Sequence, residues 1–229
     1  MKNLLNEKPT KTLHGRLLAS VNFVSDTDLI NKEVLDIGCG YGWSELSFLE
    51  RGVKKLSGVE VSEDSLKTIK QNIKDERLVL KSGDAANLPF ENELFDTVVA
   101  WEVIEHIPKN TEPLMFKEVY RVLKPGGHFY LSTPRKSLFT NILDPAWWLI
   151  GHRHYSLKNL SEFAQNNNFE IMETKIVGSW WTLFSIIDLY VSKWIFRRNK
   201  LFNNYLNKKE DKEFSSEGFV NIFIKFKKI

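Results

Sequence analysis

Three glycines at alternate positions follow a short apolar stretch that ends in an acid, within residues 34–42. The apolar stretch predicts a buried parallel strand, which ends around Asp36. Gly38, Gly40 and Gly42 allow a tight turn and a close approach to a ligand, because no Cβ intervenes. A helix predicted to follow would point unpaired N–H groups at that ligand. The segment therefore predicts a nucleotide-like ligand on this turn.

The spacing of the glycines argues against a dinucleotide. The dinucleotide fingerprint is G-x-G-x-x-G, and Trp43 stands where its third glycine would be. Asp36, two residues before Gly38, would repel a pyrophosphate. A ligand with a cationic centre and an ammonium group would be attracted to that carboxylate instead. S-adenosylmethionine (SAM) carries both groups, so the residues favour SAM over NAD.

Further motifs follow the glycines in order along the chain. Leu56–Glu60 predicts a second strand that ends in an acid, and such an acid binds ribose hydroxyls in nucleotide-binding folds. Asp84 follows a third predicted strand, and residues 123–131 read as a turn into a fifth. Together with the glycines, these motifs resemble class I SAM-dependent methyltransferases over residues 34–133. The resemblance implies that Asp84 contacts the adenine amino group and that the backbone N–H of Ala85 meets the ring.

The resemblance also implies a cation from the N-terminal helices for the methionine carboxylate, and Arg16 is the candidate. Cys39, the single cysteine, is expected to be a small buried residue in the glycine turn. The residues expected to contact SAM are Arg16, Asp36, Gly38, Cys39, Gly40, Glu60, Val61, Asp84, Ala85 and Trp101.

Catalytic groups are expected in the segment 101–108, which leaves the fourth predicted strand. Its Glu102-Val103-Ile104-Glu105-His106 stretch is similar to ubiquinone-biosynthesis O-methyltransferases. On a short helical turn, Glu102 would share a face with Glu105 and His106, and the three could hold a divalent cation. Alternatively His106 acts as a base or orients the acceptor, or the segment is only a polar wall of the pocket.

A second histidine pair, His152 and His154, precedes Ser156, which reads as the N-cap of a helix over 157–166. The pair is therefore expected on a loop at the mouth of the active site. Either histidine could complete a metal site or act as base, and His154 joins His106 and Glu102 as a catalytic candidate. In the alternative interpretation this loop is merely anchored by hydrogen bonds, with Tyr155 packed in the core.

Aromatic side chains are concentrated late in the chain. Five of the seven tryptophans follow residue 146, namely Trp147, Trp148, Trp180, Trp181 and Trp194. Residues 180–196 predict a helix with a narrow polar stripe and a wide apolar face, followed by Arg197, Arg198 and Lys200. Such a helix is too short to span a bilayer, and its pattern fits a membrane interface or a lipid substrate. The alternative is that it packs on the domain or on a second subunit.

The predicted elements that position these residues alternate between strands and helices, which indicates an α/β fold with a parallel sheet. Strands are expected at 33–37, 55–60, 77–82, 95–100, 127–132, 169–177 and 218–227. Helices are expected at 43–51, 63–74, 111–122 and 157–166. The resemblance implies one seven-stranded, doubly wound Rossmann-like sheet in the order 3-2-1-4-5-7-6, with strand 7 antiparallel. We expect a single domain over 1–229 with a helical cap over 1–30. Two substrate-side insertions are expected, an irregular one at 134–156 and a second at 178–217.

Composition limits the remaining function classes. The net charge of +3 in 229 residues, with no basic stripe in the motif region, argues against nucleic acid. One cysteine and no signal-peptide pattern fit a cytoplasmic protein, with peripheral contact to the inner membrane face through 180–200. We expect methyl transfer to a small or lipophilic acceptor, with a quinol-like, lipid or lipid-linked glycan hydroxyl as the candidate group. A binding protein without methyl transfer and an aminopropyltransferase are the alternatives.

Overall fold

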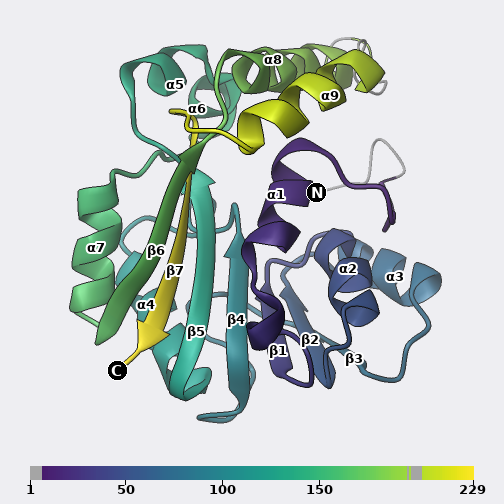
Figure 1. The fold of residues 1–229 in the computed structure, drawn as a ribbon, viewed down its shortest axis with the longest axis vertical. Helices are drawn as coiled ribbons and strands as arrows, with labels where there is room; N and C mark the ends of the chain where they lie inside the picture. Colours follow the sequence, from purple (N-terminus) through teal and green to yellow (C-terminus); the bar gives the residue numbers. More distant parts are fainter. Residues whose placement is uncertain (1–6, 195, 197–202) are drawn as a thin grey trace.

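The computed structural model describes residues 7–194, 196 and 203–229. Its centre is a seven-stranded sheet in the order β3-β2-β1-β4-β5-β7-β6, as the motifs implied (Figure 1). The first five strands in this order are mutually parallel, and β7 pairs antiparallel with both β5 and β6. The order reverses between β1 and β4, which is where open α/β sheets bind ligands.

The strands are β1 Glu33–Ile37, β2 Lys55–Glu60, β3 Leu78–Ser82, β4 Phe95–Trp101, β5 Leu123–Pro134, β6 Phe169–Val177 and β7 Asn221–Lys228. The helices are α1 Gly15–Phe23, a 3-10 turn at Asp26–Asp28, α2 Trp43–Glu50, α3 Glu63–Asn72, α4 Glu112–Val122, α5 Leu138–Leu143, α6 Pro145–Ile150, α7 Leu157–Gln165, α8 Trp180–Trp194 and α9 Asn203–Phe214.

Two apolar cores cover the two faces of the sheet. Neighbouring residues of one strand point to opposite faces, so that Leu35 belongs to one core and Val34 to the other. The first core packs against α4 and α7 through residues such as Phe116. The second packs against α1, α2 and α3 through residues such as Phe48. Because both faces are covered, the open edge for a ligand lies at the strand ends.

Local sequence explains where several elements begin. Ser62 caps α3 by accepting a hydrogen bond from the backbone N–H of Ser65. Ser156 forms a capping box with Asn159 at the start of α7, as its place in the sequence predicted. The expectation of an irregular segment over 134–156 was wrong in part. Ser137 and Asp144 accept backbone N–H bonds there and start the short helices α5 and α6.

The helices α5, α6, α8 and α9 gather at one end of the molecule, beyond the carboxyl ends of β4 and β5 (Figure 1). We call them the insertion helices, since they come from the two insertions. α8 contacts α5, α6 and α9, while α1 contacts α9. Within the described ranges, the structure has no helix that is long and apolar enough to cross a membrane. The predicted Arg197, Arg198 and Lys200 edge lies outside the described residues.

Candidate active site

The glycine turn after β1 has a backbone that only glycine adopts easily. Gly38 has a φ of +71°, and a Cβ there would lie 2.5 Å from Cγ2 of Val103. The N–H of Gly40 donates to Oε2 of Glu60 at 3.1 Å, and Oε1 of Glu60 accepts from the N–H of Ser62 at 3.0 Å. One carboxylate at the end of β2 therefore holds the turn against the start of α3.

Above this turn lies a cavity of about 510 Å³, here called the glycine-loop cavity. Its volume falls within the range of about 300–1,000 Å³ that is usual for small-molecule sites. The predicted SAM residues that line it are Gly38, Gly40, Glu60, Val61, Asp84 and Ala85. Asp84 is exposed there, and its Oδ1 accepts from the N–H of Ala86 at 2.7 Å.

Four predicted SAM residues do not line this cavity. Asp36 and Cys39 are buried beneath the turn, 1% and 5% exposed, and Trp101 packs against Phe223 at 6.2 Å between ring centroids. Arg16 lines a different pocket, described below. Ile37 at the end of β1 lines the cavity but Asp36 does not, so the carboxylate expected at the ligand lies outside the cavity lining.

A second buried acid, Glu45 of α2, accompanies Asp36 beneath the turn. Burial raises the pKa of Glu45 to about 8, and burial together with Glu45 raises the pKa of Asp36 well above its usual range. Both oxygens of Glu45 and Oδ1 of Asp36 lack hydrogen-bond partners among the described residues. Two ionised carboxylates would be costly here, and the raised pKa values mean that protonated forms are favoured.

Glu102 stands at the end of β4 with a left-handed backbone, φ +56°. Its carboxylate accepts hydrogen bonds from Ser132 at 2.8 Å, Arg16 at 3.0 Å and Asn221 at 3.2 Å. The predicted helical turn that would align Glu102 with Glu105 and His106 is therefore not formed. A non-glycine residue in this region is strained, and such strain is found most often at functional sites.

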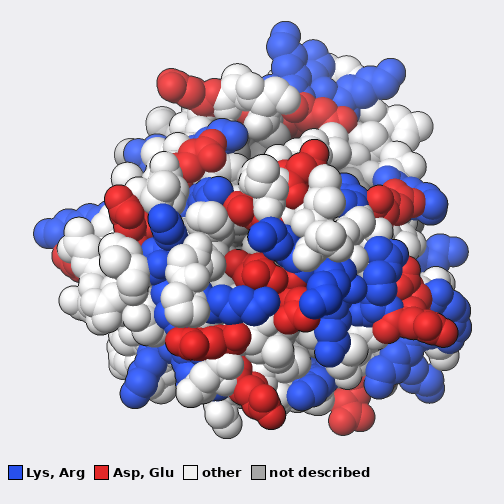
Figure 2. Space-filling view, turned by 60° about the horizontal axis from the view of Figure 1, so that its bottom comes forward, with Lys and Arg blue, Asp and Glu red and all other residues white. Residues whose placement is uncertain are grey.

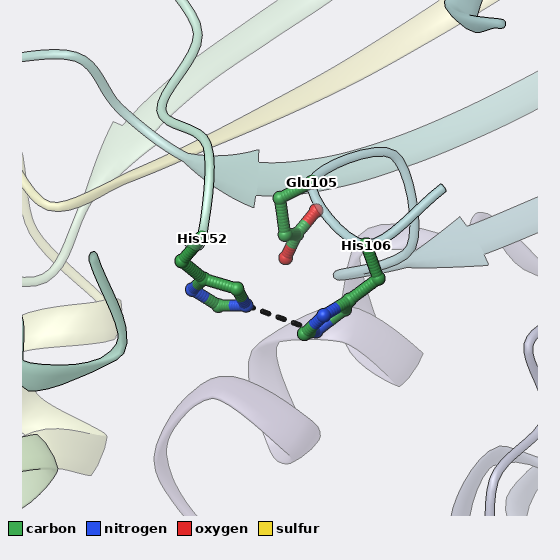
Figure 3. A group of neighbouring side chains, drawn as sticks. All are labelled: Glu105, His106 and His152. Carbon is green, nitrogen blue, oxygen red and sulfur yellow. Dashed lines mark hydrogen bonds between the residues drawn. The ribbon is translucent and has the colours of Figure 1, made fainter. Parts of the chain in front are cut away.

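Glu105 and His106 instead approach His152 (Figure 3). Nε2 of His106 and Nε2 of His152 are hydrogen-bonded at 2.9 Å, so one nitrogen donates and the other accepts. Oε2 of Glu105 accepts from Thr133, while its Oε1 has no partner among the described residues. One ligand atom from each of the three acidic or imidazole groups lies within 4.8 Å of the others.

His154 is held inside the loop and faces other partners. Its Nε2 lies 2.9 Å from Oδ2 of Asp144 and its Nδ1 lies 2.8 Å from Oδ1 of Asn141. Trp147 lies against its ring at 4.8 Å between centroids. Because both ring nitrogens are engaged and the side chain is fully buried, His154 is poorly placed to accept a proton from a ligand. Tyr155 is in the core, as the alternative interpretation expected.

The two histidine-bearing segments and the insertion helices enclose a second pocket of about 180 Å³, here called the histidine pocket. Its polar side includes Arg16, Glu102, His106 and His152. Its apolar side comes from α8 through Leu183, Ile186, Leu189 and Tyr190. Glu102 and His106 also line the glycine-loop cavity. The two cavities therefore meet at these two side chains.

Electrostatics keep the imidazole at this junction neutral. Burial by surrounding atoms, and after it the neighbouring His152, Arg16 and Arg153, together lower the pKa of His106 to about 4. His106 nevertheless keeps an exposed outer surface. Burial and the nearby Glu102 raise the pKa of Glu105 well above its usual range.

Sequence reasoning missed three residues around this junction. Asn221 of β7 and Ser132 of β5 bind the Glu102 carboxylate, and Asp144 lies 3.6 Å from Nδ1 of His152. Burial alone would raise the pKa of Asp144, but the hydrogen bond to His154 and the nearby His152 lower it. The pairing of β5 with β7, which brings Asn221 to Pro134, was the one signal that pointed to Asn221.

Comparisons with known proteins agree with the fold and with the motifs of residues 34–127. A family model described as a methyltransferase domain matches residues 34–127. The chain is similar to class I SAM-dependent methyltransferases. A putative methyltransferase structure from Bacillus halodurans aligns with a TM-score of 0.65 at 22% identity, over 92% of this chain and 99% of that one. This likeness shows the fold.

Two curated relatives are similar over the motif region. One is a probable S-adenosylmethionine-dependent methyltransferase of Mycolicibacterium smegmatis, 27% identical over 62% of this chain. The other is the phthiotriol/phenolphthiotriol dimycocerosates methyltransferase of Mycobacterium leprae, 34% identical over 49% of this chain. The matches span only 54% and 42% of those relatives' lengths.

Proposed function

We propose that this protein transfers the methyl group of SAM to a hydroxyl of a lipophilic acceptor. The observation that carries the proposal is the shared boundary of the two cavities, at Glu102 and His106. A cofactor in the glycine-loop cavity and an acceptor in the histidine pocket would meet there. Because the sulfonium methyl is already activated, the protein's main contribution is to align the two reactants and exclude water.

In the proposed cofactor pose, Glu60 and Asp84 mark the nucleoside end of the cavity. A carboxylate offers about four lone-pair sites, so Glu60 can hold the turn and still accept from ribose hydroxyls. Asp84 faces the adenine in this pose. Arg16 has five N–H donors, one of which contacts Glu102, and it remains the candidate for the methionine carboxylate.

His106 is the candidate base for the acceptor hydroxyl. It is kept neutral at physiological pH, and a neutral imidazole can accept a proton from a hydroxyl that approaches from the histidine pocket. His152 shares the proton across the 2.9 Å hydrogen bond and orients the ring. His154 and Asp144 act as positioning residues, because they hold the loop that carries His152.

A divalent cation is a second hypothesis for the same cluster. The partnerless Oε1 of buried Glu105 lies beside the Nε2 atoms of His106 and His152, a mixed oxygen and nitrogen set that suits such an ion. Bound there, the cation would act as a Lewis acid on an acceptor oxygen. Activity that EDTA abolishes and Mg²⁺ or Zn²⁺ restores would favour the cation, whereas activity indifferent to EDTA would favour the base alone.

The acceptor class follows from the apolar wall that α8 gives the histidine pocket. Leu183, Ile186 and Leu189 offer no partner for a sugar or an ionic substrate, but they suit a hydrocarbon chain or an isoprenoid tail. The Mycobacterium leprae relative is named for methylation of a lipid, which supports the same class. A quinol-like phenol with a lipid tail and a lipid-linked glycan both remain within it.

The proposed function is tested first by SAM binding. Isothermal calorimetry should detect one site, and Glu60→Ala should weaken it at least about tenfold, since each hydrogen bond to a charged group contributes about 1.5–3 kcal/mol. Glu63→Ala, an exposed acid three residues later, is the matched control and should leave affinity unchanged. If folded Glu60→Ala binds SAM as the wild type does, the proposed pose is wrong.

Binding without transfer would favour the alternative of a SAM-fold binding protein. Transfer is measured as labelled methyl moving from SAM into organic-solvent extracts of lipids. With decarboxylated SAM and an amine supplied instead, transfer of the aminopropyl group to the amine with release of methylthioadenosine would indicate an aminopropyltransferase.

A further inference from the structure

The helix α8 buries a polar stripe and exposes large apolar side chains, which is the reverse of an ordinary surface helix. Four of its polar side chains form a buried stripe, and they are Thr182, Ser185, Asp188 and Ser192, at 3%, 0%, 6% and 0% exposure. Thr182 donates to Oε2 of Glu213 at 2.9 Å, and Ser192 donates to Asp188 at 3.2 Å. A surface helix normally buries its apolar side and exposes its polar side. The reversal means that the outer side of α8 is built to meet something apolar.

The outward side chains of α8 are large and form part of a wider surface. We call this surface the aromatic face, and it consists of Leu138, Phe139, Trp148, Trp180, Trp181 and Phe184. These side chains are exposed by 70%, 46%, 69%, 53%, 37% and 47%, in that order. Aromatic contact links α5 to α8, since the ring centroids of Phe139 of α5 and Trp180 of α8 are 5.0 Å apart. An exposed apolar surface that spans three helices marks an interaction site.

Beside the aromatic face, α9 points its lysines outward and its acidic side chains inward. On α9, Lys208 and Lys212 are exposed, and Lys209 lies over the ring of Trp181 at 5.4 Å. The acids of the same helix turn inward. Asp211 accepts from the N–H of Gly15, and Glu213 accepts the N–H groups of Trp181 and Thr182 that begin α8. The edge of the aromatic face is therefore basic.

We propose that the aromatic face docks onto an anionic lipid bilayer. Tryptophan and phenylalanine side chains enter the boundary between headgroups and acyl chains, and the lysines of α9 lie against lipid phosphates. Charge favours this occupant over a second copy of the chain. In a symmetric dimer the same surface meets itself, and the basic edges would be brought together rather than neutralised.

Docking would place the histidine pocket next to the membrane. The side of α8 that faces away from the buried polar stripe and the aromatic face carries Leu183, Ile186 and Tyr190, which line that pocket. A lipid acceptor could then pass from the bilayer into the pocket along one helix. Docking itself does not depend on methyl transfer, and only this delivery step rests on the proposed function.

The test is co-sedimentation of the full chain with vesicles. The protein should bind vesicles of phosphatidylcholine with phosphatidylglycerol, and bind pure phosphatidylcholine much more weakly. The double variant Trp148→Ser/Phe184→Ser should reduce partitioning by about tenfold or more, because the area withdrawn from water is lost. Leu114→Ser/Met172→Ser removes two apolar side chains that are 48% and 50% exposed outside the aromatic face and should leave partitioning unchanged.

A second double variant tests the role of the basic edge and is not expected to disturb the fold. Lys208→Gln/Lys212→Gln leaves every buried contact in place and should weaken binding to anionic vesicles by roughly fivefold for each lysine. It should leave binding to phosphatidylcholine as it was.

Sedimentation velocity and SAM calorimetry complete the experiment. A monomer that binds SAM but ignores both vesicle types would overturn docking and leave the proposed function standing. A dimer that Trp148→Ser/Phe184→Ser dissociates would assign the aromatic face to a second copy and overturn the proposal. Vesicle binding without SAM binding would support docking and contradict the proposed function.

Discussion

At the scale of single residues, His106 connects the two cavities and carries the most specific chemical prediction. Replacing His106 with alanine should lower kcat by about 10²–10⁴-fold, which is what a general base usually contributes. SAM affinity should change little, because Glu60 and Asp84 lie at the other end of the glycine-loop cavity. Steady-state kinetics with calorimetry separates the two effects. Full activity in the variant would exclude His106 as the base.

The dependence of kcat on pH gives an independent test of His106 as the base. Because its pKa is lowered to about 4, the imidazole stays in the basic form well below the ordinary histidine value of 6.5. We expect kcat to be flat across neutral pH and to fall only as pH approaches about 4. The lowered pKa also stabilises the folded state above pH 6.5, and this contribution is lost as pH falls toward 4. A fall in kcat centred near 6.5 would contradict the assignment.

For Glu45, we expect folding stability to change with pH in the opposite direction. Its pKa is raised from 4.5 to about 8, so the folded state binds its proton more tightly than the unfolded state does. The resulting stability is fully present below pH 4.5 and is lost as pH rises through about 8. Urea unfolding at several pH values should show this loss, and Glu45→Gln should reduce it to the part that comes from Asp36. The exposed Glu50 of the same helix gives the control Glu50→Gln, which should keep the wild-type pH dependence.

At the scale of elements, α8 depends on an acid from α9. The carboxylate of Glu213 accepts the N–H groups of Ser179, Trp181 and Thr182 at 2.9–3.0 Å, which are unpaired donors at the helix N-terminus. Glu213→Ala should reduce the free energy of unfolding by about 1–3 kcal/mol, given the usual cost of losing charged hydrogen bonds. Chemical denaturation measures this, and amide exchange should quicken first at the start of α8. Glu217→Ala, at an exposed site nearby, should cost little.

Strand positions could be predicted well from the sequence, whereas the faces of the late helices could not. The run Val34–Ile37 is buried on both sides of the sheet and is apolar except for Asp36, and β1 and β6 have the expected bounds. The polar stripe of α8 was visible, but periodicity does not say which face points inward. That depended on Glu213, which lies 31 residues or more along the chain from its α8 partners.

The candidate site likewise contains contacts that local sequence predicts and contacts that it does not. Glu60 and Gly40 belong to a continuous strand-turn-helix unit, so their proximity follows from local sequence. Glu102 was expected beside His106, but its left-handed backbone turns it toward Arg16, Ser132 and Asn221. His152 rather than His154 meets His106, because Asp144 and Asn141 hold His154 inside the loop. Such choices are made by tertiary contacts, which spacing does not reveal.

At the scale of the whole molecule, charge and apolar surface are distributed unequally. The end opposite the insertion helices shows basic and acidic side chains intermingled over its surface, without a basic stripe (Figure 2). The insertion helices carry the aromatic face and the lysines of α9. The cavities lie between these two ends, where the sheet order reverses at β1 and β4. The molecule therefore presents its proposed site toward the end that carries its apolar surface.

In the proposed complex, SAM lies in the glycine-loop cavity with its reacting end toward the histidine pocket. A crystal structure of the complex with S-adenosylhomocysteine tests this most directly. We expect ribose hydroxyls at the Glu60 carboxylate, the adenine near Asp84, and the sulfur facing the junction at Glu102 and His106. A ligand bound with its sulfur directed away from the histidine pocket, or bound outside the glycine-loop cavity, would contradict it.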